Sequence, residues 1–363
     1  MLFQAEVLEA FTQRILQALG TPEDAARLVA HSLVKANLRG VDSHGLLLVP
    51  VYVQQLEIPS VDPKAEGRVI HENGPCLVYD GQNGLGQVVA DRSCDQVIRL
   101  AKNYGMGMVV ARESNHFGSA GYWARKITRA GLLGIVMTNA SPAVPPFQGK
   151  EPRFGTSPIC VAVPSTGEGA WMLDMATTTV SMGKLYSAFW RGETTIPAGW
   201  ATDKDGVPTT DTETAINGLM SPLGGYKGSG LAMLVEILCS VLSGGPMSGE
   251  VHSLRWSREP LRISHMFLAV DISRFLPPEE FQQRMQWLVP HVKSAAPAAG
   301  YSEVLVADEP ELRMEAQRRV EGIPISESLW SDLCAIARRV GVEPPEVGQA
   351  VGAKEEGGAA NVP

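Results

Sequence analysis

Short β-rich runs alternate with amphipathic helical segments in the middle of the chain, and this alternation restricts the fold more than any other feature. Strands are expected at 77–80 and 106–111, with a helix between them whose apolar residues recur at helical spacing from Ala90 to Ala101. A helix over 119–130 and a strand over 132–138 repeat the pattern. The order indicates an α/β protein in which helices pack against a sheet.

Later segments extend this pattern. Short β-rich runs occur at 159–163, 171–175 and 266–271, and an apolar helix is expected over 230–243. The longest apolar stretch, 231–242, contains Glu236 and is too short to span a bilayer.

Both ends of the chain are expected to be helical. Thr21 is a candidate N-cap, Pro22 occupies the first helical position, and Gly40 ends the amphipathic run that follows. Near the other end, helices are expected at 277–292, 309–321 and 326–340.

The segments suggest two lobes and a tail. Residues 1–65 and 285–345 are expected to form one discontinuous helical lobe, and residues 66–284 an α/β lobe. The tail over 346–363, rich in Gly, Ala and Glu, is expected to be disordered.

Charge and cysteine content exclude several classes of protein. The chain has 31 Lys and Arg against 39 Asp and Glu, a net charge of −8, which disfavours binding to nucleic acid or to a membrane surface. The 5 cysteines are an odd number, are widely spaced and contain no CxxC pair. This pattern disfavours zinc ribbons and disulfide frameworks, and with the absence of a signal peptide it predicts a cytoplasmic protein with reduced thiols.

The glycine motifs of the common nucleotide-binding folds are absent. Gly228-Ser229-Gly230 is followed by Met233 where the third glycine of a dinucleotide fingerprint belongs. Gly183-Lys184 has Thr178 where a Walker A loop begins with glycine. Any nucleotide must therefore be bound by a different architecture.

Three polar clusters bounded by glycine are candidates for a site: 42–45 (DSHG), 114–118 (SNHFG) and 224–230 (GGYKGSG). Glycine lets a ligand approach the backbone, and histidine is the side chain best suited to move a proton near neutral pH. His44 and His116 are thus candidates for proton transfer, although each could equally be a hydrogen-bonded structural residue.

Six ordered motifs, which together extend over nearly the whole chain, resemble the type-2 malate/L-lactate dehydrogenase family. They are GVDSHGLLLVP (40–50), SNHFGSAGYW (114–123), RFGTSP (153–158), LDMAT (173–177), GVPTTD (206–211) and PLGGYKGSG (222–230). The resemblance implies a non-Rossmann α/β (α+β) fold, with a mixed sheet in the lobe that binds cofactor and substrate. It also implies a homodimer that transfers a hydride between NAD or NADP and a 2-oxo or 2-hydroxy acid.

The same resemblance assigns the site residues. His116 corresponds to the acid/base histidine, and His44, with Ser43 beside it, to a second histidine that orients and polarises the substrate; the reverse assignment stays open. Cofactor contacts are implied at His44, Gly118, Ser119, Ala120, Met172, Leu173, Asp174, Met175, Ala176, Tyr226, Lys227, Ser264, Asp308, Glu309, Pro310 and Glu311. Asp174 or Glu309 would accept from a ribose hydroxyl, whereas a turn-capping Asp174, a solvated Lys227 and a helix-starting Glu309 are the structural alternatives.

One position departs from the family pattern. Many members have an arginine three residues after the glycine of SHG, where it can pair with the substrate carboxylate, but this chain has Leu48. The triplet Leu46-Leu47-Leu48 resembles the hydroxycarboxylate dehydrogenase branch, whose substrates include aromatic and larger 2-oxo acids. We expect Leu48 and Tyr52 to line the substrate pocket, with the carboxylate partner elsewhere.

Alternative functions remain. A cyclic ketimine acid reductase of the same family is one, and a non-catalytic nucleotide-binding descendant is another. A metal-dependent hydrolase or lyase would use His44, His116 and Asp42, but Asp42 and His44 are only two residues apart and no HxxxH pair is present, so no metal is expected.

Overall fold

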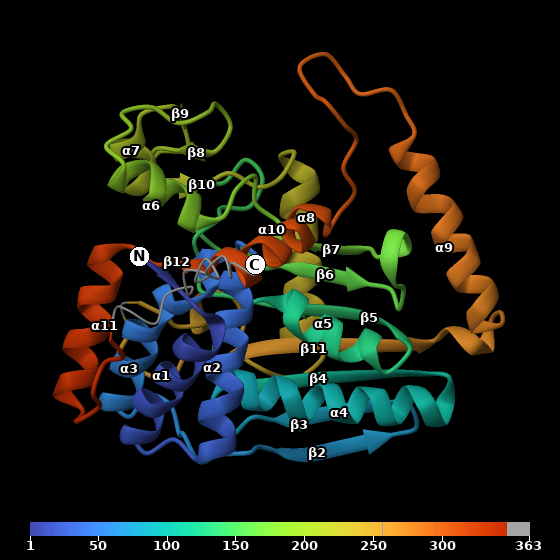
Figure 1. Cartoon of the computed structure of the whole chain (residues 1–363), viewed down its shortest axis with the longest axis horizontal. Coiled ribbons are helices and arrows are strands. Elements are labelled where there is room, and N and C mark those ends of the chain that lie inside the picture. Colours follow the sequence, from blue (N-terminus) through green and yellow to red (C-terminus); the bar gives the residue numbers. More distant parts are fainter. Residues whose placement is uncertain (256, 347–363) are drawn as a thin grey trace, which may run out of the picture.

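A mixed sheet forms the centre of the molecule (Figure 1). The computed structural model describes residues 1–255 and 257–346, and in this part of the chain the largest sheet has seven strands in the order β2-β3-β4-β11-β5-β6-β7. The β3–β4 pair is parallel and the other pairs are antiparallel, which confirms the expected mixed sheet. The strands are β2 (Arg68–Asn73), β3 (Cys76–Asp80), β4 (Met106–Ser114), β5 (Leu132–Thr138), β6 (Ile159–Ala162), β7 (Met172–Met175) and β11 (Ile263–Asp271).

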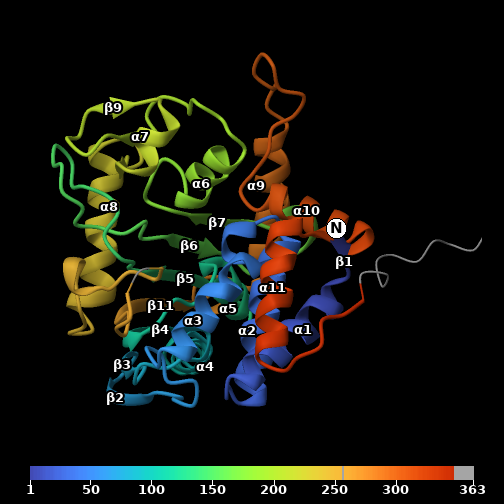
Figure 2. The ribbon, with the colours of Figure 1, turned by 90° about the vertical axis from the view of Figure 1, so that its left-hand side faces the viewer.

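Helices cover both faces of this sheet. On one face α4 (Gly86–Tyr104) and α5 (Ala120–Arg129) bury Leu100 and Trp123 against strand residues such as Phe267. On the other face α8 (Tyr226–Glu236) continues into a π-helical turn (Ile237–Val241) and buries Val235 and Cys239 against Met266. Figure 2 shows α8 on the side of the sheet opposite to the N-terminal helices.

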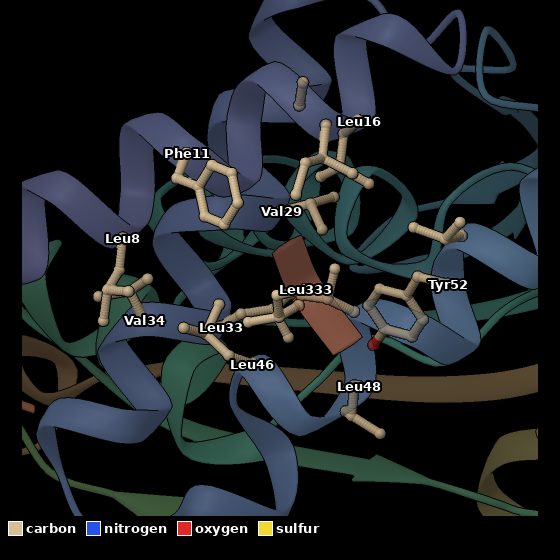
Figure 3. Close-up of a cluster of buried hydrophobic side chains, with 14 of the residues drawn as sticks. Leu8, Phe11, Leu16, Val29, Leu33, Val34, Leu46, Leu48, Tyr52 and Leu333 are labelled. Carbon is tan, nitrogen blue, oxygen red and sulfur yellow. The ribbon is translucent and has the colours of Figure 1, made fainter. Parts of the chain in front are cut away.

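The helical part of the molecule contains both ends of the described chain. It consists of α1 (Ala5–Ala18), α2 (Glu23–Leu38), α3 (Val49–Glu57) and α11 (Glu327–Arg339), with the short turns η1 (Asp42–His44) and η2 (Leu46–Leu48) before α3. One hydrophobic core joins Leu8, Phe11, Leu33, Tyr52 and Leu333 (Figure 3). Strand β1 (Leu2–Phe3) pairs with β12 (Ile323–Pro324), so the two ends also share backbone hydrogen bonds.

A smaller unit lies beyond strand β7 and has its own core, which includes Leu185, Ile196 and Met220 (Figure 1). Its elements are α6 (Met182–Trp190), β8 (Ala201–Thr202), β9 (Pro208–Thr209), α7 (Thr212–Ile216) and β10 (Leu219–Met220).

The last two helices before α11 are α9 (Pro278–Lys293) and α10 (Glu309–Glu321). Helix α9 runs unbroken across the expected lobe boundary at residue 284 and contacts the short helix η3 (Gly167–Gly169) between β6 and β7. Helix α9 therefore packs with the sheet part of the molecule, whereas α10 contacts α2. The two-lobe division with this boundary remains a proposal.

Some local expectations need correction. Thr21 does not cap α2: Pro22 is the N-cap residue, and the Thr21 hydroxyl is buried without a partner in the described structure. The helix expected over 230–243 begins earlier, at Tyr226, and changes to π-helical geometry at Ile237. The expected tail lies, apart from Glu346, outside the described residues. Within the described chain, no helix combines the length and apolarity that a membrane span requires.

Candidate active site

A cavity of about 700 Å³ lies where the N-terminal helical segment meets loops that follow the central strands. Its walls come from parts of the chain that are far apart in sequence: 39–48, 116–120, 156–158, 172–176, 181–186, 254–255 and 305–311. A volume of this size is typical of pockets that bind small molecules and cofactors.

Two histidines face each other in this cavity. His44 ends the turn η1 and His116 follows strand β4, and their rings stack with centroids 5.7 Å apart. Both rings contact the cavity but lie deep in the protein, so that burial lowers the pKa of His44 to about 4. Burial also lowers the pKa of His116 to about 3, with the charges of His44, His265 and Arg255 acting in the same direction. Both imidazoles are therefore neutral at neutral pH.

Tyr52 fixes the orientation of His116. Its hydroxyl lies 2.7 Å from His116 Nδ1 and itself accepts a hydrogen bond from Gln87 Nε2 at 3.0 Å. The backbone N–H of Gly118 also points at Nδ1, at 3.4 Å. With donors from two sides, Nδ1 acts as an acceptor, and the proton of the neutral ring resides on Nε2. His116 Nε2 is then the nitrogen that can exchange a proton with a ligand.

The loop that carries His116 is held by close packing. A Cβ on Gly86, the first residue of α4, would lie 2.2 Å from the Asn115 carbonyl oxygen, so only glycine lets the helix approach this loop. Buried His265 stacks on Phe117 with centroids 4.5 Å apart, and its two ring nitrogens contact hydroxyls of Ser114 and Thr138, each at 2.8 Å.

The cavity also has an acidic region. Asp174 accepts hydrogen bonds from Ser119 Oγ at 3.0 Å and from the Gly121 N–H at 2.7 Å, and burial raises its pKa. Asp308 is bound by Arg39 and by Arg125, the latter at 2.5 Å, and adopts a left-handed conformation with φ of 81° as the N-cap residue of α10. Carboxylates at these positions can accept hydrogen bonds from ribose hydroxyls, so the donor and acceptor set fits a nicotinamide dinucleotide.

The structure brings most of the sequence-predicted residues to this cavity. Those that line it are Ser43, His44, Leu48, His116, Gly118, Ser119, Ala120, Met172, Leu173, Asp174, Ala176, Asp308, Pro310 and Glu311. Tyr52 lies directly behind His116.

Five predicted cofactor residues do not line the cavity of this chain: Met175, Tyr226, Lys227, Ser264 and Glu309. Ser264 is fully buried within strand β11, and Glu309 is engaged by Lys293 and Arg313. Tyr226 and Lys227 begin α8, where the Tyr226 side chain is 63% exposed.

Sequence analysis missed four residues of the site: Arg39, Gln87, His265 and Arg255. No motif marks them, because each reaches the site only through tertiary packing. Gln87 and His265 lie just before the segments expected as helix (from Ala90) and strand (266–271), so no local signal marked them either.

In the part of the chain that the structure describes, no three His, Cys, Asp or Glu side chains gather as potential ligands of a metal ion. Asp42, the carboxylate of the metal-site hypothesis, instead accepts hydrogen bonds from Arg318 and from Asn37.

A stacked pair of neutral histidines and the two carboxylates Asp174 and Asp308 thus share one cavity. Sequence comparison identifies the family of the chain: the profile of the malate/L-lactate dehydrogenases matches residues 3–334. The malate dehydrogenase of Pyrococcus horikoshii is 40% identical over 93% of this chain and 94% of that protein. Hydroxycarboxylate dehydrogenase B of Escherichia coli is 32% identical over 96% of each.

Solved structures agree. Sulfolactate dehydrogenase from Methanocaldococcus jannaschii superposes with a TM-score of 0.88 at 35% identity, covering 94% of this chain and 98% of that one. A structure of delta1-piperideine-2-carboxylate reductase from Pseudomonas syringae gives a TM-score of 0.82 at 26% identity, covering 93% and 100%. The chain belongs to the malate/L-lactate dehydrogenase family, which confirms the resemblance and makes it an oxidoreductase with a nicotinamide cofactor.

The buried histidines predict how stability depends on pH. Burial lowers the pKa of His265 to about 3, as it lowers those of His44 and His116. Below pH 6.5 the unfolded chain binds protons that the folded chain does not, so the free energy of unfolding falls as pH falls towards 4, by up to about 1.4 kcal/mol per pH unit for each histidine. Urea unfolding between pH 7.5 and 5.5 measures this slope.

The matched variants are His265→Gln, which removes one of the buried groups, and His71→Gln, which changes an exposed residue of strand β2. We expect a shallower slope for the first and an unchanged slope for the second. Equal slopes in all three proteins would contradict the assignment.

Proposed function

We propose that the protein transfers a hydride between NAD or NADP and a 2-oxo or 2-hydroxy acid. The observation that carries this proposal is the stacked pair of neutral histidines at one cavity, with His116 Nδ1 committed to Tyr52. Membership of the dehydrogenase family supports the same reaction class. The bound nicotinamide would supply or accept the hydride.

His116 would move the proton at Nε2. In the oxidative direction the neutral ring takes the hydroxyl proton, and in the reductive direction an imidazolium gives it to the oxygen where negative charge develops. Tyr52 suits both forms, because its hydroxyl can donate to a bare Nδ1 or accept from a protonated one. His44, with Ser43 Oγ 2.9 Å from its Nδ1, would orient and polarise the substrate.

The substrate pocket would admit larger or aromatic acids. Leu48 is 2% exposed, belongs to the helical core and still contacts the cavity, where Leu47 and Leu254 add to an apolar wall. Such a wall favours apolar substituents at C3 over a second carboxylate.

A cyclic ketimine acid is the second candidate substrate, favoured by the structural similarity to the piperideine carboxylate reductase. Its reduction would use the same proton from His116, delivered to nitrogen instead of oxygen.

We also propose a homodimer and a cytoplasmic location. Helix α8 and its π-helical extension are apolar on their outer side as well as on the side facing the sheet: Met233, Ile237, Val241 and Leu242 are all exposed in the single chain. A helix that is apolar all round is normally buried, so a second copy of this chain is the proposed cover. The location rests on the cysteine pattern.

The first test is oxidation of NADH and NADPH, followed optically, with pyruvate, oxaloacetate, 2-oxoglutarate, phenylpyruvate and a cyclic ketimine acid. We expect turnover with at least one acid, and a loss of about 10²- to 10⁴-fold in kcat for His116→Asn, the typical contribution of a general acid. His71→Asn is the matched control. Failure to bind either cofactor would overturn the proposed function, and a larger kcat loss for His44→Asn would reverse the two histidine roles.

Leu48→Arg tests the pocket wall. A guanidinium here would favour a second carboxylate through charge-assisted hydrogen bonds, raising kcat/KM for oxaloacetate relative to phenylpyruvate by about tenfold or more. Steady-state kinetics with both acids give the ratio, and Leu47→Met serves as an apolar control at the neighbouring position. An unchanged ratio in Leu48→Arg argues against this pocket assignment.

Light scattering of the full chain tests the dimer. We expect twice the mass of one chain, and a single-chain mass for Val241→Asp, because a buried unpaired carboxylate destabilises an apolar interface. Val320→Asp, an equally drastic change at an exposed valine of α10, should leave the mass unchanged. A single-chain mass for the unaltered protein would exclude this assembly.

A further inference from the structure

Arg255 carries a positive charge at the cavity that no carboxylate of the described chain neutralises. Two arginines line the cavity, Arg39 and Arg255. Arg39 is held by Asp308 and Glu315. Arg255 instead lies over an aromatic ring, with its Cζ 5.9 Å from the ring centroid of Tyr186 on α6. A guanidinium in a partly enclosed cavity is strongly stabilised by an anionic partner. A ligand bound in this cavity can supply that anion.

Arg255 acts at the histidine end of the cavity. Arg255 and His116 line the same cavity, and the positive charge of the guanidinium contributes to lowering the pKa of His116. The residues Leu254 and Leu48 line the same cavity, so the cation is near an apolar wall.

The backbone next to Arg255 is fixed to the helix that forms this wall. Gln55 is buried on α3, and its Nε2 donates to the Leu254 carbonyl oxygen at 3.2 Å. Leu48 is the N-cap residue of α3, and Tyr52 lies one turn before Gln55. The hydrogen bond therefore ties the Arg255 segment to the helix that positions Leu48 and the partner of His116.

We propose that Arg255 binds the carboxylate of the substrate, in place of the arginine that many family members have at position 48. The guanidinium would form two charge-assisted hydrogen bonds with the carboxylate and leave C2 of the substrate to the histidines. Recognition comes from the loop at 254–255 instead of from η2, so the wall at Leu48 stays apolar. The proposal deepens the proposed function and rests on it.

Carboxylate binding at Arg255 also has a consequence for His116. The bound anion offsets the positive charge that disfavours the imidazolium, so substrate binding promotes the protonated ring that reduction requires. The other groups that act on or contact His116 are His44, His265 and Tyr52.

The test compares Arg255→Gln and Arg255→Lys with Arg258→Gln, a change at an exposed arginine of the same loop. With the best 2-oxo acid, KM should rise by about 10- to 100-fold in Arg255→Gln, the range expected for a lost charge-assisted hydrogen bond. Arg255→Lys should recover part of this loss, and kcat should change less than KM. Arg258→Gln should behave as the unaltered protein, and fluorescence titration should give the same affinity for the reduced cofactor in all four.

A second readout separates carboxylate binding from a structural role. The unaltered protein should have a lower KM for the free acid than for its methyl ester. Arg255→Gln should raise the KM of the acid alone, because only the acid carries the negative charge, and so abolish this preference. If acid and ester are impaired equally, or if KM for the acid is unchanged, the proposal is overturned.

Failure of the proposed function is distinguishable from failure of this inference. Absence of cofactor binding or of any turnover by the unaltered protein removes the dehydrogenase assignment for 2-oxo acids. Turnover that is indifferent to Arg255 removes this inference alone. Equilibrium binding of oxamate to the complex with reduced cofactor tests Arg255 without turnover: it should weaken in Arg255→Gln, and unaltered or undetectable binding in both proteins counts against the proposal.

Discussion

The hydrogen bond between the Tyr52 hydroxyl and His116 Nδ1 joins the two parts of the molecule that enclose the cavity. Tyr52 belongs to the helical core and His116 to the loop after strand β4, so the bond fixes one part against the other where the chemistry is expected. Gln87 at the start of α4 completes the chain of donors. Leaving one of these buried polar groups without a hydrogen-bond partner destabilises the fold by more than the bond itself stabilises it. This asymmetry favours the one arrangement in which all of the groups are paired.

Charge is distributed unequally along the cavity. Asp308, the acidic N-cap of α10, is held in a left-handed conformation by Arg39, the C-cap residue of α2, and by Arg125 from α5. Three helices thus converge on one buried carboxylate, and the strain at Asp308 is tolerated because the surrounding ion pairs determine its position. The histidine end has no such compensation: its rings are neutral because they are buried, and Arg255 adds a positive charge that favours an anionic ligand there.

The sequence pattern allowed the α/β character to be predicted, because the buried strands carry continuous apolar runs and the helices between them an apolar stripe, whereas the mixed sheet was implied by the family resemblance. It did not reveal β2, whose residues are all exposed, or the two-residue strands of the small unit, which are too short to show a period. In the site, the glycine-bounded histidines could be recognised from local sequence. Gln87, His265 and Arg255 could not, since their neighbours are set by tertiary packing. Lys227 had the same local signature as the histidines, yet it does not line the cavity of this single chain, because its helix α8 packs on the face of the sheet away from α4 and α5.

The position of Leu48 is compatible with the proposed change of specificity. Its side chain belongs to the helical core and to the cavity wall at once, so the residue type at this position affects both packing and recognition. An arginine at this nearly buried position must extend its charge into the cavity or pair it with a ligand, because a buried unpaired charge is destabilising. Leucine instead extends the hydrophobic core to the surface of the pocket. If Arg255 binds the carboxylate, as proposed, the binding group lies on a segment that contacts the core through Leu254 and the Gln55 hydrogen bond, so recognition becomes separable from packing. Substitution at Arg255 can then alter the preferred anion with little effect on stability, while changes at Leu48 affect both properties together.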